Sequence, residues 1–120
     1  MQYAIDFDAR PGPLTVVQQN IDQFSSEFLA YLPDNLHVYE AFEREALAIV
    51  GRGIKHYSAH TIIHVLRHHS ALAENSGDGW KINDHVSPYL ARLFVLMYPQ
   101  HIDLFEFRIA KSAARDLVGA

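Results

Sequence analysis

The stretch from Lys55 to Ser70, KHYSAHTIIHVLRHHS, carries the clearest structural signal in the chain. At about 100° per residue, its residues fall on two opposite sides of a helix. The apolar side consists of Ala59, Ile62, Ile63 and Leu66. The polar side consists of His60, Thr61, His64, Arg67 and His68. We therefore expect a helix over residues 58–73, capped by Ser58, whose apolar side faces the core.

Charge is distributed unevenly around this stretch. Residues 1–45 contain eight acidic and two basic residues, whereas residues 46–73 contain Arg52, Lys55 and Arg67 and no acidic residue. The formal net charge of the whole chain is −4. Histidine gains positive charge as the pH falls below neutrality, so the polar side of the 58–73 helix becomes more cationic in acid. The middle of the chain is therefore the part best suited to an anionic partner.

The composition predicts one domain spanning residues 1–120. The chain has 120 residues, of which 49% are hydrophobic, and this is enough for one buried core. It has no cysteine and therefore no disulfide framework. No apolar run reaches the length of a membrane span, and the N-terminus lacks the features of a secretory signal. We expect a cytoplasmic protein that does not contact a membrane.

Apolar spacing and helix-breaking residues predict further helices. An N-terminal arm, residues 1–13, precedes a first helix over residues 14–32. Asp34 is expected to cap a second helix that runs to Val50 and ends at the glycines that follow. Ser87 is expected to cap a fourth helix that runs to Tyr98, and residues 100–118 predict one or two short helices.

The expected fold is a mainly α, compact domain of about five helices. Residues 80–82, Trp-Lys-Ile, follow a glycine-containing turn and are expected to be extended. The order of a helix, a glycine turn, a capped helix and such a segment is similar to a winged helix with a short β-ribbon. In a helix-turn-helix arrangement of this kind, the 58–73 helix is the one that reads DNA.

DNA binding is the first functional hypothesis. It assigns phosphate or base contacts to Lys55, His60, Thr61, His64, Arg67, Lys81 and Arg92. No nucleophile elbow, phosphate-binding loop or dinucleotide fingerprint is present, so we expect no enzymatic activity and no cofactor. We expect the active species to be a homodimer that uses the long first helix as its interface.

Protein binding is the second hypothesis. The acidic N-terminal half, residues 1–45, predicts a module that inhibits or recruits a host protein of opposite charge. A solvated or dimer-buried histidine face without any ligand is about as compatible with the sequence as DNA binding.

A metal site is the third hypothesis, and it is limited by geometry. Histidines four residues apart on a helix can hold one ion, but residues eight apart are separated by about 12 Å along the axis. His60 and His64 are therefore the weak candidates for a single pair, and the sequence assigns no metal. Further ligands would have to come from Glu74, Asp78, Asp84 or His85.

One part of the chain resembles a known group of proteins. The string KIN at residues 81–83, SPYLARLF at residues 87–94, Pro99 and FEFR at residues 105–108 resembles a group of small uncharacterised proteins associated with bacteriophages and prophages. The resemblance covers residues 55–108 and implies an intracellular accessory protein. The matching positions that a shared surface would include are Lys81, Asn83, Tyr89, Arg92 and Arg108.

Overall fold

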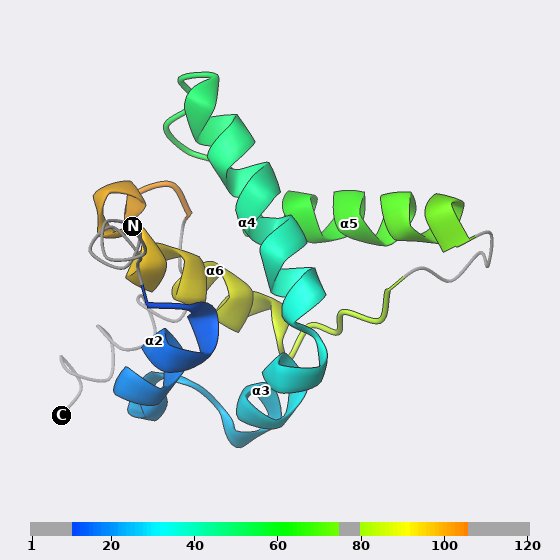
Figure 1. Cartoon of the computed structure of the whole chain (residues 1–120). Helices are drawn as coiled ribbons and strands as arrows, with labels where there is room; N and C mark the ends of the chain where they lie inside the picture. Colours follow the sequence, from blue (N-terminus) through cyan, green and yellow to red (C-terminus); the bar gives the residue numbers. More distant parts are fainter. Residues whose placement is uncertain (1–10, 75–79, 106–120) are drawn as a thin grey trace, which may run out of the picture.

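The computed structural model describes residues 11–74 and 80–105, apart from the side chain of Glu74. In these two ranges the fold is mainly helical, as predicted (Figure 1). Its five α-helices are α2 (Pro13–Gln19), α3 (Ser26–Tyr31), α4 (Leu36–Gly51), α5 (Ala59–Glu74) and α6 (Ser87–Met97). Short 3-10 turns η1 (Ile21–Gln23), η2 (Leu32–Asp34) and η3 (Pro99–His101) complete the described elements.

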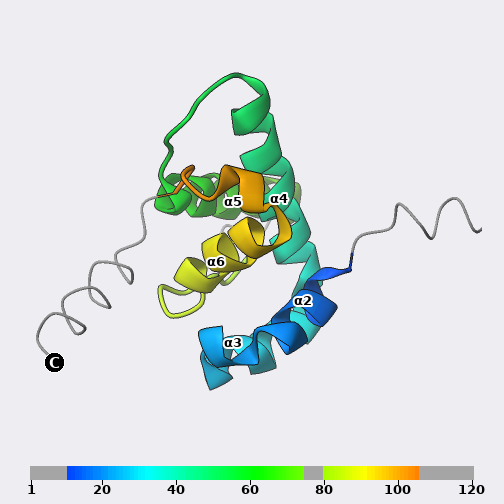
Figure 2. The ribbon, with the colours of Figure 1, turned by 90° about the vertical axis from the view of Figure 1, so that its left-hand side faces the viewer.

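Helix α6 lies at the centre of the packing. It contacts α2, α4 and α5, which cover it from different sides (Figures 1 and 2). Its Leu90, Leu93 and Phe94 side chains are fully buried. Because α6 is apolar over most of its circumference, it can serve as a common partner for three helices. The core is therefore one continuous cluster rather than separate pairwise contacts.

Aromatic side chains join the outer segments to α6. The Phe28 ring lies 5.3 Å from Phe24 and 5.6 Å from Tyr89, which ties α3 to α6. On the other side, the Phe105 ring lies 5.6 Å from Phe42 of α4 and 5.8 Å from Phe94 of α6. These centroid distances lie in the range that favours offset or edge-to-face aromatic contacts. The segment after η3 is thus held against the same core as the long helices.

The continuous first helix predicted over residues 14–32 is wrong. The chain instead forms α2, η1, α3 and η2 in succession. Asn20 leaves the helical conformation and its side-chain amide donates to the Val16 carbonyl, and Ser25 caps α3 by accepting a hydrogen bond from the Phe28 N–H. Short polar side chains offer the backbone these local alternatives to a continued helix. The long helix proposed as a dimer interface is therefore absent.

Helix α4 begins and ends close to the predicted positions. Asp34 belongs to η2 and Asn35 is the N-cap, so the prediction of Asp34 as the cap is wrong by one residue. At the C-terminus, the Ile54 N–H donates to the Ile49 carbonyl and the Gly53 N–H to the Val50 carbonyl. This is the Schellman pattern of hydrogen bonds. Gly53 has a φ of +82°, the left-handed conformation that this motif requires.

Tyr39 on α4 is a core residue that the apolar spacing did not identify. Its side chain is fully buried, and its hydroxyl donates a hydrogen bond to Glu43 at 3.3 Å. Burial, and then the adjacent Glu43 carboxylate, raise the pKa of the Tyr39 hydroxyl. The tyrosine is therefore neutral in the folded protein and acts as a large apolar side chain with one satisfied donor.

The N-termini of α5 and α6 can be compared with the two caps predicted for these helices. The Ser58 hydroxyl accepts a hydrogen bond from the Thr61 N–H, and α5 begins at Ala59 as expected. For α6, the N-cap is Val86 rather than Ser87, so that prediction is wrong by one residue. The Asn83 side chain instead satisfies the backbone before α6, because its oxygen accepts hydrogen bonds from the N–H groups of His85 and Val86.

The β-ribbon of the winged-helix prediction is not supported. The described residues contain no strand, and residues 80–82 run without strand pairing. An isolated parallel bridge joins Tyr57 to Phe105, and neither residue belongs to the 80–82 segment. Most of the expected N-terminal arm and of the 100–118 helical region lies outside the described residues. Within the described part, none of the helices has the length and apolar character needed to cross a membrane.

The Schellman motif predicts opposite effects for two neighbouring glycine substitutions. Gly53→Ala should lower the free energy of unfolding by about 1–2 kcal/mol, because alanine is strained at positive φ. Gly51→Ala is the matched control. Gly51 is the last residue of α4 and has open space at the Cβ position, so alanine should stabilise the helix by at most about 0.5–1 kcal/mol. Urea denaturation of the two variants measures both changes, and equal changes would contradict the assignment of the motif.

Candidate functional site

Helix α5 is held to the core by one apolar face. Ile62, Ile63 and Leu66 are 1%, 0% and 5% exposed, and they pack into the cluster formed with α4 and α6. The same face carries the buried Ser70. This agrees with the side predicted to face the core, and it fixes the rotation of α5 about its own axis.

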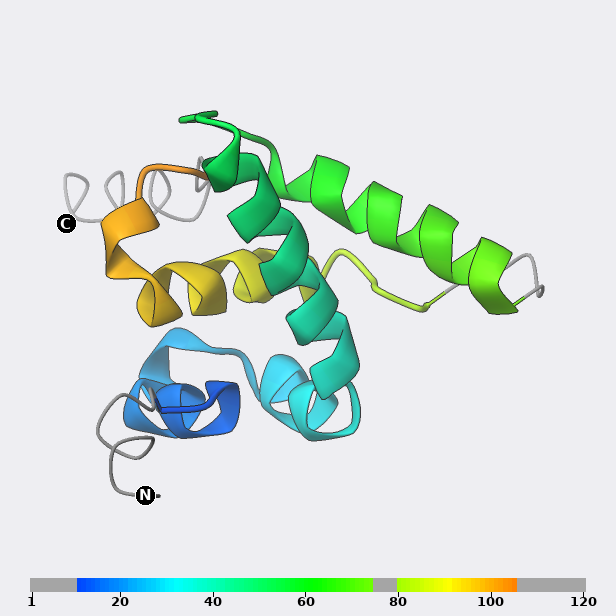
Figure 3. The same cartoon turned by 45° about the horizontal axis from the view of Figure 1, so that its top comes forward.

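The opposite face of α5 is open to solvent. His60, Thr61, His64 and His68 are exposed, and Arg67 is partly exposed. No segment among the described residues covers this face. The helix also reaches past the ends of the other helices (Figures 1 and 3). A helix displayed in this way can approach a partner without obstruction by the rest of the described fold.

Of the remaining predicted contact residues, two lie near the ends of α5 and one lies on α6. Lys55 is exposed in the loop just before the helix, and Lys81 is exposed just after Trp80, which is tied to the C-terminal half of α5. Arg92 belongs to α6, where its guanidinium donates to the Gln23 side chain at 3.4 Å. Arg92 is therefore apart from the exposed face of α5.

Both ends of α5 are anchored by hydrogen bonds. Before the helix, the Tyr57 N–H donates to the Leu104 carbonyl at 2.8 Å, and the His56 ring donates through Nδ1 to the Asp103 carbonyl at 3.1 Å. Near the far end, the Ser70 hydroxyl accepts a hydrogen bond from the Trp80 N–H at 2.8 Å. Together with the apolar packing, these hydrogen bonds set the orientation of α5, so its exposed face has a defined direction relative to the rest of the described fold.

Two imidazoles converge on the exposed face. The Nε2 atoms of His60 and His64 are 3.0 Å apart, and their ring centroids are 4.4 Å apart with nearly perpendicular planes. One of the two nitrogens donates and the other accepts. The adjacent pair His68 and His69 has centroids 6.0 Å apart. Of the histidines on α5, only the first two thus bring their ring nitrogens together in the described structure.

The additional ligands considered for a metal do not join this pair. His85 contacts Glu27 of α3 at 3.3 Å, and Asn83 donates to the same carboxylate at 3.3 Å. Asp78 and the Glu74 side chain lie outside the described part. Within that part, no group of three or more histidine or carboxylate side chains is arranged to hold one metal ion.

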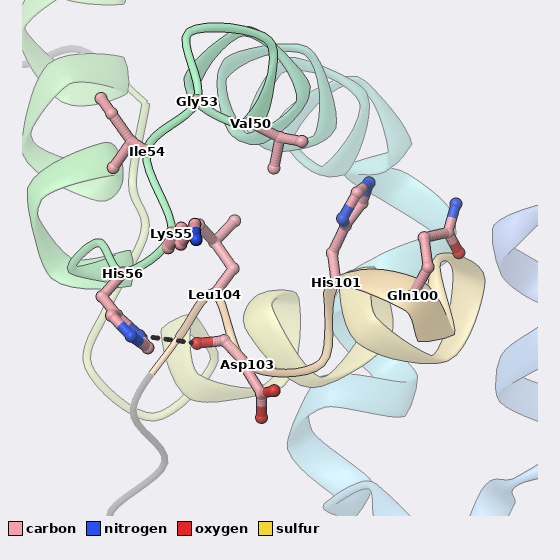
Figure 4. A pocket seen from close by; sticks show the side chains of 9 residues that line it. All are labelled: Val50, Gly53, Ile54, Lys55, His56, Gln100, His101, Asp103 and Leu104. Atoms are coloured by element: carbon pink, nitrogen blue, oxygen red, sulfur yellow. Dashed lines mark hydrogen bonds between the residues drawn. The ribbon is translucent and has the colours of Figure 1, made fainter.

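A shallow pocket of about 400 Å³ opens next to the start of α5 (Figure 4). The C-terminal end of α4, the loop before α5 and the segment around η3 enclose it. Its polar groups do not converge on one point, because the His56 ring turns toward the Asp103 carbonyl. The lining residues are Val50, Gly53, Ile54, Lys55, His56, Gln100, His101, Asp103 and Leu104.

Sequence reasoning missed the Ser70 anchor and the Glu27 contacts. The sequence signal for Ser70 is its position four residues after Leu66, which places the serine on the apolar side of the helix. The contacts of Glu27 join residues more than fifty positions apart. No local pattern predicts a pairing of that kind.

Comparisons with protein families, with curated proteins and with solved structures found no significant match to this chain. The geometry of α5 is therefore the basis on which a function can be inferred.

Loss of the Ser70 anchor should be visible in the only tryptophan of the chain. Ser70→Ala leaves the Trp80 N–H without this acceptor and should lower the free energy of unfolding by about 1–2 kcal/mol. Tryptophan fluorescence should shift to longer wavelength as the residue 80–82 segment loosens. Ser26→Ala, at an exposed position on α3, is the control and should change stability by less than about 0.5 kcal/mol. An unchanged Trp80 spectrum in Ser70→Ala would contradict the anchor.

Proposed function

We propose that this protein binds DNA without enzymatic activity, through the exposed face of α5, as an accessory protein of the phage or prophage type. The observation that carries the proposal is a fixed, uncovered helix face that bears Arg67, Thr61 and imidazoles within a stretch that has no acidic residue. Such a surface offers hydrogen-bond donors and positive charge to phosphates and base edges.

The dimensions of α5 fit this role. Its 16 residues make a helix about 24 Å long, and the major groove of DNA is wide enough to admit an α-helix. The exposed Lys55 and Lys81 lie near opposite ends of the helix, where they would contact the phosphates that flank the groove. Arg67 lies between them on the helix itself. Insertion of α5 into the groove requires no β-ribbon.

The small number of basic residues sets the expected strength of binding. Lys55, Arg67 and Lys81 could neutralise about three phosphates, which corresponds to a slope near −2.7 for log affinity against log salt concentration on duplex DNA. Binding at neutral pH should therefore be weak and detectable mainly below about 100 mM salt.

The test is a fluorescence anisotropy titration of a labelled 25-base-pair duplex with the full chain at several salt concentrations. Arg67→Ala should weaken binding at low salt and reduce the salt slope by about 0.9, because one phosphate contact is lost. Arg44→Ala removes the same charge from an exposed position on α4 and should leave both quantities close to wild type. Absence of binding at 25 mM salt, or equal losses in both variants, would contradict the proposal.

A second candidate function is binding of a basic protein partner through the acidic N-terminal half. Asp22, Glu27, Asp34 and Glu40 are exposed in the described part of this half, and they lie outside α5. Such carboxylates steer a partner of opposite charge and suppress partners of like charge.

A pulldown from bacterial lysate, with and without nuclease, separates the two candidates. Captured proteins that survive nuclease and are lost in the double variant Asp22→Asn, Glu40→Gln would favour the protein partner. Captured material that disappears after nuclease and depends on Arg67 would favour DNA. The double variant should retain its fold, because both side chains are exposed.

A further inference from the structure

The histidine pair on α5 brings two potential metal ligands together. His60 and His64 are one helical turn apart, and their Nε2 atoms are separated by 3.0 Å. The ring centroids are 4.4 Å apart. They would be farther apart than this if the two nitrogens faced each other in line. The two rings therefore meet at an angle, with nearly perpendicular planes, rather than in line. A proton held between them satisfies one nitrogen of each ring.

A metal ion could take the place of that proton. Bonds of about 2.0–2.1 Å from one ion to two imidazole nitrogens 3.0 Å apart meet at roughly 95°. A right angle is the angle between neighbouring ligands in the square-planar or tetragonal geometry of Cu²⁺ and Ni²⁺. A tetrahedral Zn²⁺ site would need the nitrogens roughly 3.3–3.4 Å apart. Cu²⁺ and Ni²⁺ accept the right angle that this spacing gives, and Cu²⁺ has the highest intrinsic affinity for nitrogen ligands among the first-row divalent metals.

The surroundings leave the pair free to bind an ion. Both side chains are exposed, so no buried charge has to be desolvated. His56, four residues before His60, precedes the helix and uses Nδ1 on the Asp103 carbonyl. His68, four residues after His64, is exposed on the next turn. The His64 ring is turned toward His60, which makes these two the pair that binds first.

We propose that His60 and His64 bind one Cu²⁺ or Ni²⁺ ion through their Nε2 atoms. Each ring stays neutral, because the proton that one Nε2 carries moves to Nδ1 of the same ring when the ion binds. The described part of the chain offers no third ligand at this point. The remaining coordination positions face solvent, and water fills them. The inference is independent of DNA binding and concerns the protein alone.

The experiment is a calorimetric titration of the tag-free full chain with NiCl₂ at neutral pH. Wild type should bind one equivalent of Ni²⁺ with higher affinity than any further Ni²⁺ ions. His60→Gln and His64→Gln should each lower the affinity for this equivalent about tenfold or more, because a chelate is reduced to a single ligand. His68→Gln is the matched control on the same face, and its affinity should stay within about twofold of wild type.

Electron paramagnetic resonance of the bound Cu²⁺ provides a second measurement. Wild type and His68→Gln should show coupling to two imidazole nitrogens, and His60→Gln should not. Circular dichroism checks that each variant keeps its helices. The proposal is overturned if His60→Gln binds Ni²⁺ as tightly as wild type, or if His68→Gln loses as much affinity as His60→Gln. Because no DNA is present, either result leaves the DNA titration unaffected.

Discussion

Burial of Ile62, Ile63 and Leu66 determines which way the polar side of α5 faces. Each of these side chains contributes about 1.5–3 kcal/mol when it is fully removed from water. Rotating α5 by a half turn would expose all three and would place imidazoles and Arg67 against the apolar core. The combined cost would equal a large part of the stability of a domain of this size. The exposure of the histidine face is therefore a consequence of core packing and requires no separate stabilising contact.

Hydrogen bonds at the two ends of α5 add to the apolar packing and hold the helix to other segments of the fold. The bond from the Tyr57 N–H to the Leu104 carbonyl holds the start of the helix to the segment after η3. That segment is itself fixed by the packing of Phe105 between α4 and α6. At the other end, the Ser70 hydroxyl holds the backbone of Trp80. The surface of α5 is thus supported by contacts from parts of the chain that are distant in sequence.

The features that could be predicted from the sequence are those with local causes. The position of α5 follows from its apolar spacing and its serine cap, and the end of α4 follows from the glycine at residue 53. The break of the first helix was missed because apolar spacing continues across Asn20 and Ser25, although their side chains favour a cap and a turn. The β-ribbon was expected from the order of the elements and from the extended segment after a glycine-containing turn, but strand pairing depends on a partner segment that local patterns do not supply. The contacts of Ser70 and Glu27 are likewise set by tertiary packing.

The two proposals use the same face of α5 but depend on different atoms. DNA binding depends on the positive charge of Arg67 and the flanking lysines, which exists whatever the orientation of the imidazoles. Metal binding depends on the direction of two ring nitrogens, and the charge of the surface has little part in it. An ion held by His60 and His64 would add two positive charges next to Arg67, on a face that has few of its own. Coulomb attraction to phosphates would then increase, and affinity for DNA would rise with metal occupancy. Because this face carries few fixed positive charges, one bound ion would change its total charge by a larger fraction than it would on a lysine-rich face.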